Sequence, residues 1–422
     1  MSALSRTKLV SRGGADARNF IVNVVEGGLF VAGATFISVQ TVLPTMVAQL
    51  GGDNVAVGAL GFIAWGGLFL PQIFAARYVE TVAWKKPWVV RLGAVQRIIV
   101  GIIGLVLLLF GGSDPGLALG LFLVLYAVMH LVLGIVTPAW VDLIAKVTPV
   151  AKRGRLAGFR SSLAGAMGFA CGILLTWILG SLHLPVNYAV AFGCAFLLQA
   201  LSIFVQSRLV EAEPSHAGER KPLKAFLAQI PGVLRRSPPF RNFIIAMAFL
   251  VMATVSMTFF TLNAIREFQA DPSIAGQFTM IIVGSQVISA PAVGYLADRH
   301  GNRIALIVAA TALMCASISA ILAPTLGWFR VVFVFLGINL GSELMARYNF
   351  AIEFAPEKDR AMYFGLMNAL LAPFYAVSLL GGWISNVAGY SVVFQVGAAC
   401  SLAGIFLMVL SVREPRAIVR QG

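Results

Sequence analysis

The sequence predicts an all-α integral membrane protein whose twelve transmembrane helices form two pseudo-symmetric bundles of six. Three observations predict this fold class: an apolar composition, twelve apolar stretches of spanning length, and loops that divide the positive charge unequally. Hydrophobic residues make up 59% of the 422 residues and charged residues only 11%, with a mean hydropathy of +0.89. Because soluble domains carry about 25% charged residues, this composition excludes an ordinary soluble protein.

Each apolar stretch is long enough to cross a bilayer, which takes about 20 residues at a rise of 1.5 Å per residue. Residues 1–19 form a basic N-terminal arm, 208–239 a polar linker and 413–422 a tail, so the bundles cover 20–207 and 240–412. The predicted spans, in chain order, are 20–47, 55–76, 88–110, 116–141, 157–180, 186–207, 240–263, 272–297, 303–323, 328–349, 362–385 and 391–412.

Lysine and arginine occur almost entirely in the N-terminal arm, the tail and every second connection. Of the 31 basic residues, only Arg266 and Arg330 fall on the other side of the predicted membrane. The positive-inside rule then places both termini and the linker in the cytoplasm. An odd number of spans would destroy this alternation. We therefore expect a multi-pass protein of the inner or plasma membrane.

The formal net charge of +14 does not indicate a nucleic-acid partner. The basic residues border the spans, where they fix orientation and can contact anionic lipid headgroups. The cysteines, Cys171, Cys194, Cys315 and Cys400, all lie in predicted spans and lack the spacing of metal ligands. The sequence therefore predicts neither disulfides, nor a metal site, nor a cofactor.

The two halves of the chain repeat each other in four places. The linker between them carries mixed charge and the pair Pro238-Pro239, which indicates a connection rather than a domain. The matched segments, in order, are 76–85 with 294–303, Asp142 to Gly158 with Asn349 to Gly365, Asn187-Tyr188 with Gly389-Tyr390, and Glu213-Pro214 with Glu414-Pro415. Four matches in one order predict a duplicated six-helix unit in parallel orientation.

One of these segments carries a recognisable loop signature. The pattern Gly-x-Leu-Ala-Asp-Arg-x-Gly-x-Arg runs from Gly294 to Arg303, through Asp298 and Gly301. On this signature and the duplicated twelve-span pattern, the chain resembles the major facilitator superfamily from about residue 18 to residue 412. The subfamily is not assigned, because the better copy of the signature follows span eight instead of span two.

The resemblance implies that spans one, four, seven and ten line a central cavity, and that the signature cluster latches the cytoplasmic side. A carboxylate such as Asp298 can accept hydrogen bonds at a neighbouring helix N-terminus, and Gly301 permits a tight turn. The predicted gating residues are Gly294, Asp298, Arg299, Gly301, Arg303, Glu80, Lys85, Asp142 and Arg153.

Polar residues inside the spans are the candidate functional residues, because a charge at mid-bilayer costs roughly 2.5–3.5 kcal/mol on insertion scales. In the first span, Asn23, Glu26 and Gln40 share one helical face. We expect this face to line the cavity and Glu26 to couple proton movement. The alternative is a purely structural Glu26 with a buried partner.

The tenth span carries Asn339, Glu343 and Arg347 on one face, with Glu343 and Arg347 in the favourable order for an ion pair. Two arrangements are open. Glu26 contacts Arg347 across the cavity when the cytoplasmic side is closed, or Glu343 and Arg347 form a self-contained pair.

Two further candidates come from spans four and seven. His130 is the only histidine inside a span, and its ordinary pKa near 6.5 suits proton exchange. Thr258 lies on a face of hydroxyl side chains in span seven. The alternatives are a hydrogen-bonded core histidine and hydroxyls that bond their own helix backbone.

The predicted function is a secondary active transporter that moves one small solute by alternating access, with protons as the coupling ion. The sequence has no Gly-x-x-x-x-Gly-Lys-Ser/Thr motif for ATP. An enzyme is not expected, because no nucleophile–base or metal-ligand spacing occurs. The alternatives are an uncoupled facilitator and a membrane sensor or scaffold that kept this fold without transport.

Overall fold

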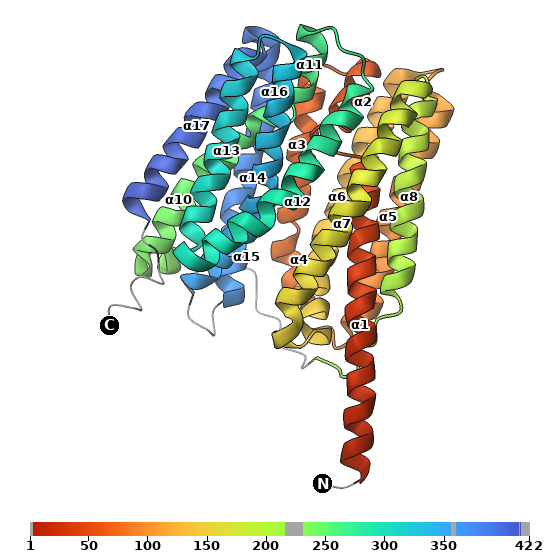
Figure 1. Cartoon of the computed structure of the whole chain (residues 1–422), viewed down its shortest axis with the longest axis vertical. Coiled ribbons are helices and arrows are strands. Elements are labelled where there is room, and N and C mark those ends of the chain that lie inside the picture. The colour runs from red at the N-terminus through yellow and green to blue at the C-terminus, as the bar shows by residue number, and fades with distance from the viewer. Residues whose placement is uncertain (1–2, 216–230, 356–359, 413, 415–422) are drawn as a thin grey trace.

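The protein is described by a computed structural model that covers residues 3–215, 231–355, 360–412 and 414. Across these ranges every regular element is a helix and no strand occurs. The long helices run up and down alongside one another (Figure 1). The start of the first helix and the end of the last lie at the same end of the molecule. We call this the basic end, and the opposite one the far end.

The N-terminal half contains six spans, of which the first two are broken. The first is α1 (Ala3–Thr35) followed by α2 (Val42–Gln49), and the second is α3 (Asn54–Phe69) followed by α4 (Gln72–Val79). The other four are α5 (Lys85–Phe110), α6 (Pro115–Val147), α7 (Arg153–Ser181) and α8 (Val186–Gln206). Pro71 separates α3 from α4, because proline lacks the N–H that would continue the helix.

The C-terminal half also contains six spans, and again two are broken. The seventh span is α10 (Pro238–Ala253), a 3₁₀ turn (Thr254–Ser256) and α11 (Phe260–Glu267). The eleventh is α15 (Arg360–Leu371), a 3₁₀ turn that contains Pro373 (Ala372–Ala376) and α16 (Val377–Ala388). Continuous helices form the rest: α12 (Ile274–His300), α13 (Asn302–Leu322), α14 (Leu326–Glu353) and α17 (Tyr390–Ser411).

Ten of the described helical stretches are long and apolar enough to cross a membrane by themselves. The remaining two spans are the broken pairs α1–α2 and α3–α4, in which α1 continues the basic arm and α3 is a shorter apolar helix. The predicted all-α membrane fold with twelve spans is therefore confirmed. The main difference from the sequence prediction is that residues of the arm already belong to the first helix.

The two halves meet mainly toward the far end. Between α7 and α12 the contacts rest on small residues: Gly168 against Val283, Gly172 against Met280 and Gly276 against Thr176. Closer to the basic end, Phe159 on α7 and Tyr295 on α12 are 56% and 67% exposed, and Figure 1 shows the two helices diverging there. This arrangement closes the far end and separates α7 from α12 at the basic end.

Neutral hydrogen bonds add to this closure. The Thr41 and Thr279 hydroxyls lie 2.5 Å apart, and Thr261 donates to the Gln40 carbonyl at 2.9 Å. Tyr390 donates to the Asn54 side chain at 2.8 Å. Beside them, α3 and α16 approach so closely that a Cβ at Gly58 would overlap the Ser378 carbonyl oxygen.

Gly58→Ala should therefore open the far end. An overlap with backbone costs about 1–3 kcal/mol, which shifts an equilibrium by roughly 5- to 150-fold. In a variant whose four cysteines are replaced by serine, a cysteine at Thr261, which is fully buried in this closure, should react faster with an aqueous maleimide when Gly58→Ala is added. Gly120→Ala is the control, because nothing lies within 4 Å of its Cβ position. Equal labelling rates in both variants would contradict the closure described here.

Candidate functional site: the central cavity

A cavity of about 440 Å³ lies between the two halves. The N-terminal half contributes residues of α1, α3, α5, α6 and α8, and the C-terminal half residues of α10, α12, α13, α14 and α17 and of the 3₁₀ turn at Ala372–Ala376. Spans one, four, seven and ten thus line the cavity as expected, and most of the other spans also contribute residues to its wall. Most of the wall is apolar or aromatic, and amide and hydroxyl side chains are interspersed.

The structure places five of the eight predicted cavity residues in this wall. They are Gln40, His130, Asn339, Glu343 and Arg347. The other three, Asn23, Glu26 and Thr258, are buried away from it at 0%, 2% and 3% exposure. Asn23 and Glu26 lie on α1, but neighbouring helices of the same half cover them. The expected continuous face is wrong for Gln40, which lies in the turn between α1 and α2, and Thr258 lies in the turn before α11.

Glu343 and Arg347 form the charged part of the wall. Arg347 Nε lies 3.2 Å from Glu343 Oε1, and Arg347 Nη1 donates to the Tyr375 hydroxyl at 2.9 Å. The Arg347 guanidinium also lies 5.3 Å from the ring centre of Phe69, which belongs to the other half. The Arg347 side chain is only 2% exposed, whereas that of Glu343 is 25% exposed. The carboxylate is therefore the charged group of this pair that a solute can reach.

Glu26 has its partners inside its own half. Its Oε2 lies 2.8 Å from Arg160 Nη1 of α7, and Ser202 of α8 donates to its Oε1 at 3.3 Å. Arg160 also donates to the Asn23 carbonyl at 3.1 Å and lies over the Trp140 ring. In this state the expected Glu26–Arg347 contact is not formed, and the alternative arrangements weighed from the sequence are observed instead. The sequence did not indicate this role of Arg160, because its position at the start of span five does not show that its side chain extends to Glu26.

Two cavity residues escaped the sequence analysis. Gln96 of α5 and Gln199 of α8 belong to peripheral spans, yet both line the cavity. Their side-chain oxygens are buried and have no hydrogen-bond partner in the described part of the chain. They extend the cavity toward Glu26, because Gln199 and Ser202 share a face of α8. The available sequence signal was the pair Gln199 and Ser202, two polar residues at helical spacing inside an apolar span.

His130 and Thr258 occupy different environments. His130 Nδ1 lies 3.0 Å from the Tyr126 carbonyl one turn earlier, and its ring packs edge-on against Tyr126. This contact leaves Nε2 as the ring nitrogen available to the cavity. Thr258 lies against Gly61 of α3, where the halves approach each other. Thr258 therefore belongs to the contact between halves and not to the cavity wall.

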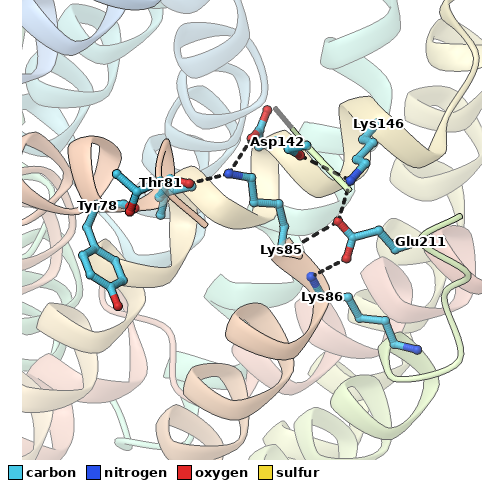
Figure 2. A network of polar contacts seen from close by, with 9 residues as sticks. Tyr78, Thr81, Lys85, Lys86, Asp142, Lys146 and Glu211 are labelled. Carbon is cyan, nitrogen blue, oxygen red and sulfur yellow. Dashed lines mark hydrogen bonds and ion pairs between the residues drawn. The ribbon is translucent and has the colours of Figure 1, made fainter. Parts of the chain in front are cut away.

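At the basic end of the N-terminal half, Glu211 is the centre of a polar network (Figure 2). Its two oxygens accept hydrogen bonds from the backbone N–H groups of Lys85 and Lys86, at 3.0 and 2.9 Å. Lys146 of α6 forms an ion pair with Glu211 at 2.8 Å. Lys85 is buried, bonds to the Val79 carbonyl and lies 3.5 Å from Asp142. The carboxylate thereby caps the N-terminus of α5 and ties it to α6.

The C-terminal half repeats this cap with Glu414. Its Oε2 accepts from the backbone N–H of Arg303 at the start of α13, at 3.2 Å. Arg303 in turn donates to the Met408 and Val409 carbonyls of α17. Gly301 has φ +93°, and a Cβ there would overlap the Glu414 carboxylate. The residue of the N-terminal half that is equivalent to Glu414 is therefore Glu211, and not Glu213 as the repeated Glu-Pro pairs suggested.

A fifth match between the two halves was missed in the sequence analysis. Arg18-Asn19-Phe20 recurs as Arg241-Asn242-Phe243 at the start of each half. Asn19 exchanges two hydrogen bonds with the Val210 backbone, and Asn242 donates to the Ser411 carbonyl. Each asparagine thus ties the first helix of a half to the end of its sixth.

The remaining predicted gating residues are less engaged. Glu80, Asp298 and Arg299 are exposed, and the Asp298 carboxylate has no hydrogen bond or ion pair among the residues that the structure describes. Gly294 has open space around it. Arg153 donates to the Ala145 and Thr148 carbonyls, which closes the turn between α6 and α7. These residues form no latch between the halves in this state, in which α7 and α12 are separated at the basic end.

Comparison with known proteins agrees with this architecture. The family model described as Major Facilitator Superfamily matches residues 244–421. The C-terminal half of the chain therefore carries the family's sequence pattern. The resemblance inferred from the loop signature is confirmed. No curated protein matches the sequence.

Solved transporter structures superpose on the whole chain. A POT family transporter in complex with 5-aminolevulinic acid has a TM-score of 0.71 at 12% identity, over 93% of this chain and 96% of that one. A D-xylose-proton symporter gives 0.68 at 14%, over 94% and 98%. The nucleoside transporter NupG gives 0.65 at 13%, also over 94% and 98%. At such identities the likeness shows the fold alone.

Glu211→Gln should destabilise the N-terminal half of this superfamily fold. The variant keeps one acceptor oxygen but loses the ion pair with Lys146 and the charged cap of α5, at a cost of about 1–3 kcal/mol. Thermal unfolding in detergent measures the loss. The exposed Glu80→Gln removes the same charge nearby and should change stability by less than about 0.5 kcal/mol. Equal effects of the two substitutions would refute the central role of Glu211.

Proposed function

We propose that this protein is a secondary active transporter that moves a small solute by alternating access and is coupled to protons. The observation that supports this most is the cavity between the halves, closed at the far end, with one accessible carboxylate in its wall. The basic end carries the cation-rich loops, so the positive-inside rule assigns it to the cytoplasm. The structure would then represent a state sealed from the outside.

Alternating access requires an interface that can separate at low cost. Every hydrogen bond found between the described residues of the two halves joins neutral groups, such as Thr41 with Thr279 and Asn368 with Gln72. Interhelical hydrogen bonds in membranes average about 0.6 kcal/mol. The halves can therefore part at the far end without exposing a buried charge.

We assign proton coupling first to Glu343. Its carboxylate is the accessible member of the Glu343–Arg347 pair, and its protonation would remove the charge that holds Arg347. Tyr375 would then be the remaining polar partner of Arg347, next to Phe69 of the opposite half. Protonation at Glu343 would thus act on a contact between halves. Glu26 is the second candidate, because it is only 2% exposed and does not line the cavity.

The cavity wall favours a particular class of solute. Glu343 offers negative charge, the cation beside it is shielded, and aromatic side chains such as Trp65 and Tyr126 line the same space. A neutral or cationic solute with an apolar or ring-shaped part fits this wall better than an anion. The similar structures are named for 5-aminolevulinic acid, D-xylose and nucleosides, which supports a solute of modest size.

Uptake into proteoliposomes tests the proposal. The panel contains labelled 5-aminolevulinic acid, D-xylose, uridine and an aromatic organic cation. One pH unit is worth about 1.4 kcal/mol per proton, so a coupled solute should accumulate up to about tenfold per unit. Glu343→Gln should abolish this accumulation and retain solute exchange without a gradient, because only the titratable group is lost.

The matched variant is Glu26→Gln, which changes the other intramembrane acid. Loss of accumulation in Glu26→Gln alone would move the coupling role from Glu343 to Glu26. Equilibration without accumulation in the wild type would indicate an uncoupled facilitator. If no solute of the panel moves and none stabilises the protein against heat, transport of this solute class is refuted.

A further inference from the structure

A second hollow lies at the basic end, outside the central cavity and close to the Glu211 network. It has a volume of about 330 Å³ and is formed where α1, α5 and α8 reach the basic end. Its wall contains three cations: Arg18 of α1, Lys86 of α5 and Arg208, two residues after the end of α8. Nothing in the proposed transport cycle uses this hollow.

The charge of the hollow is uncompensated. Among the described residues, Glu211 is the only acidic one in the wall, and both Glu211 oxygens are already occupied by Lys85, Lys86 and Lys146. Figure 2 shows the Lys86 side chain extending away from Glu211, so that its amine lies apart from these bonds. The wall therefore presents three cations to whatever enters. A phosphate group fits such a wall, because guanidinium groups bind it in bidentate geometry.

The surroundings of the hollow are those of a membrane interface. Trp84 lies in its wall and is 45% exposed, as is typical of the aromatic side chains at the level of lipid headgroups. The Arg208 guanidinium lies 4.7 Å from the ring centre of Phe204, which is 54% exposed one turn deeper on α8. Arg208 thus lies along an apolar side chain while its charge faces the basic end.

Below the hollow, the adjoining helices expose rows of apolar side chains. On α5 these include Val95, Ile98 and Ile102, and on α8 Leu201 and Leu197. An acyl chain attached to a group in the hollow would lie along these rows. A free phosphate would have no use for them, so the combination of cations, Trp84 and apolar rows favours a lipid.

We propose that this hollow binds the headgroup phosphate of an anionic phospholipid. The lipid would join α1, α5 and α8 at the point where Glu211 already ties α5 to α6. It would thereby hold the basic end of the N-terminal half together as one body. Because the proposal concerns binding and stability, its failure would leave the proposed transport function untouched.

Thermal unfolding in detergent micelles that contain increasing amounts of phosphatidylglycerol tests this proposal. Phosphatidylglycerol should stabilise the wild type, and phosphatidylcholine should not. Replacement of all three cations, Arg18→Gln with Lys86→Gln and Arg208→Gln, should weaken the apparent affinity on the order of 100-fold, since each cation near an anionic surface contributes substantially. The matched variant carries Arg155→Gln, Arg241→Gln and Arg299→Gln, which removes the same charge from exposed positions at the same end.

The outcomes separate the possible ligands. Stabilisation by phosphatidylglycerol that survives in the first variant, or that disappears equally in the matched variant, would overturn the proposal. Equal stabilisation by inorganic phosphate alone would identify a free anion as the ligand and also overturn it. If the first variant does not fold, a phosphatidylglycerol with a photoreactive headgroup is crosslinked to the wild type. Adducts should then concentrate at 84–87 and 207–211, and adducts spread over all basic loops would refute the site.

Discussion

Charge pairing inside the membrane is the constraint on which the rest of this structure depends. A charged side chain at mid-bilayer costs roughly 2.5–3.5 kcal/mol on insertion scales, so each one needs a partner. Glu26 pairs with Arg160 in the N-terminal half, and Glu343 pairs with Arg347 in the C-terminal half. All ion pairs found among the described residues lie within one half. Each bundle thus pairs its intramembrane glutamates internally.

This self-sufficiency shapes the interface between the bundles. Since no charge is needed across it, the interface consists of close glycine contacts, neutral hydrogen bonds and aromatic rings. Such contacts are specific in geometry but individually weak. The caps at the basic end, Glu211 on α5 and Glu414 on α13, strengthen each bundle internally. The proposed alternating access requires such an arrangement of two firm bodies.

The sequence predicted the spans, their number and the duplicated unit because these properties follow from local composition. Apolar length and loop charge are set by the bilayer and do not depend on how helices pack. The partners of individual side chains were harder to predict. Glu26 was assigned to the cavity from its helical face, but α7 and α8 cover that position, and Arg160 reaches it from a distant segment. Only the packing of three helices decides this.

The repeats show the same difference between sequence patterns, which are local, and side-chain contacts, which depend on distant segments. The Glu-Pro pairs matched Glu213 with Glu414. In the structure, the segments after α8 and α17 instead place Glu211 and Glu414 at equivalent helix N-termini, those of α5 and α13. The Gly294 to Arg303 signature indicated the fold. The groups that the Asp298 carboxylate can contact, however, depend on how far α12 lies from α7. Under the proposed transport cycle the contacts of this motif would change with the state, so the sequence alone does not place them.

Distance measurements between spin labels test most directly whether the two halves are rigid bodies with a separable interface. Labels at Phe159 and Tyr295 report across the halves, and labels at Phe159 and Ile98 report within one half, since all three side chains are exposed. Addition of a transported solute should populate a new distance across the halves and leave the distance within the N-terminal half unchanged. A single fixed distance across the halves, or a change within the N-terminal half of similar size, would contradict this account.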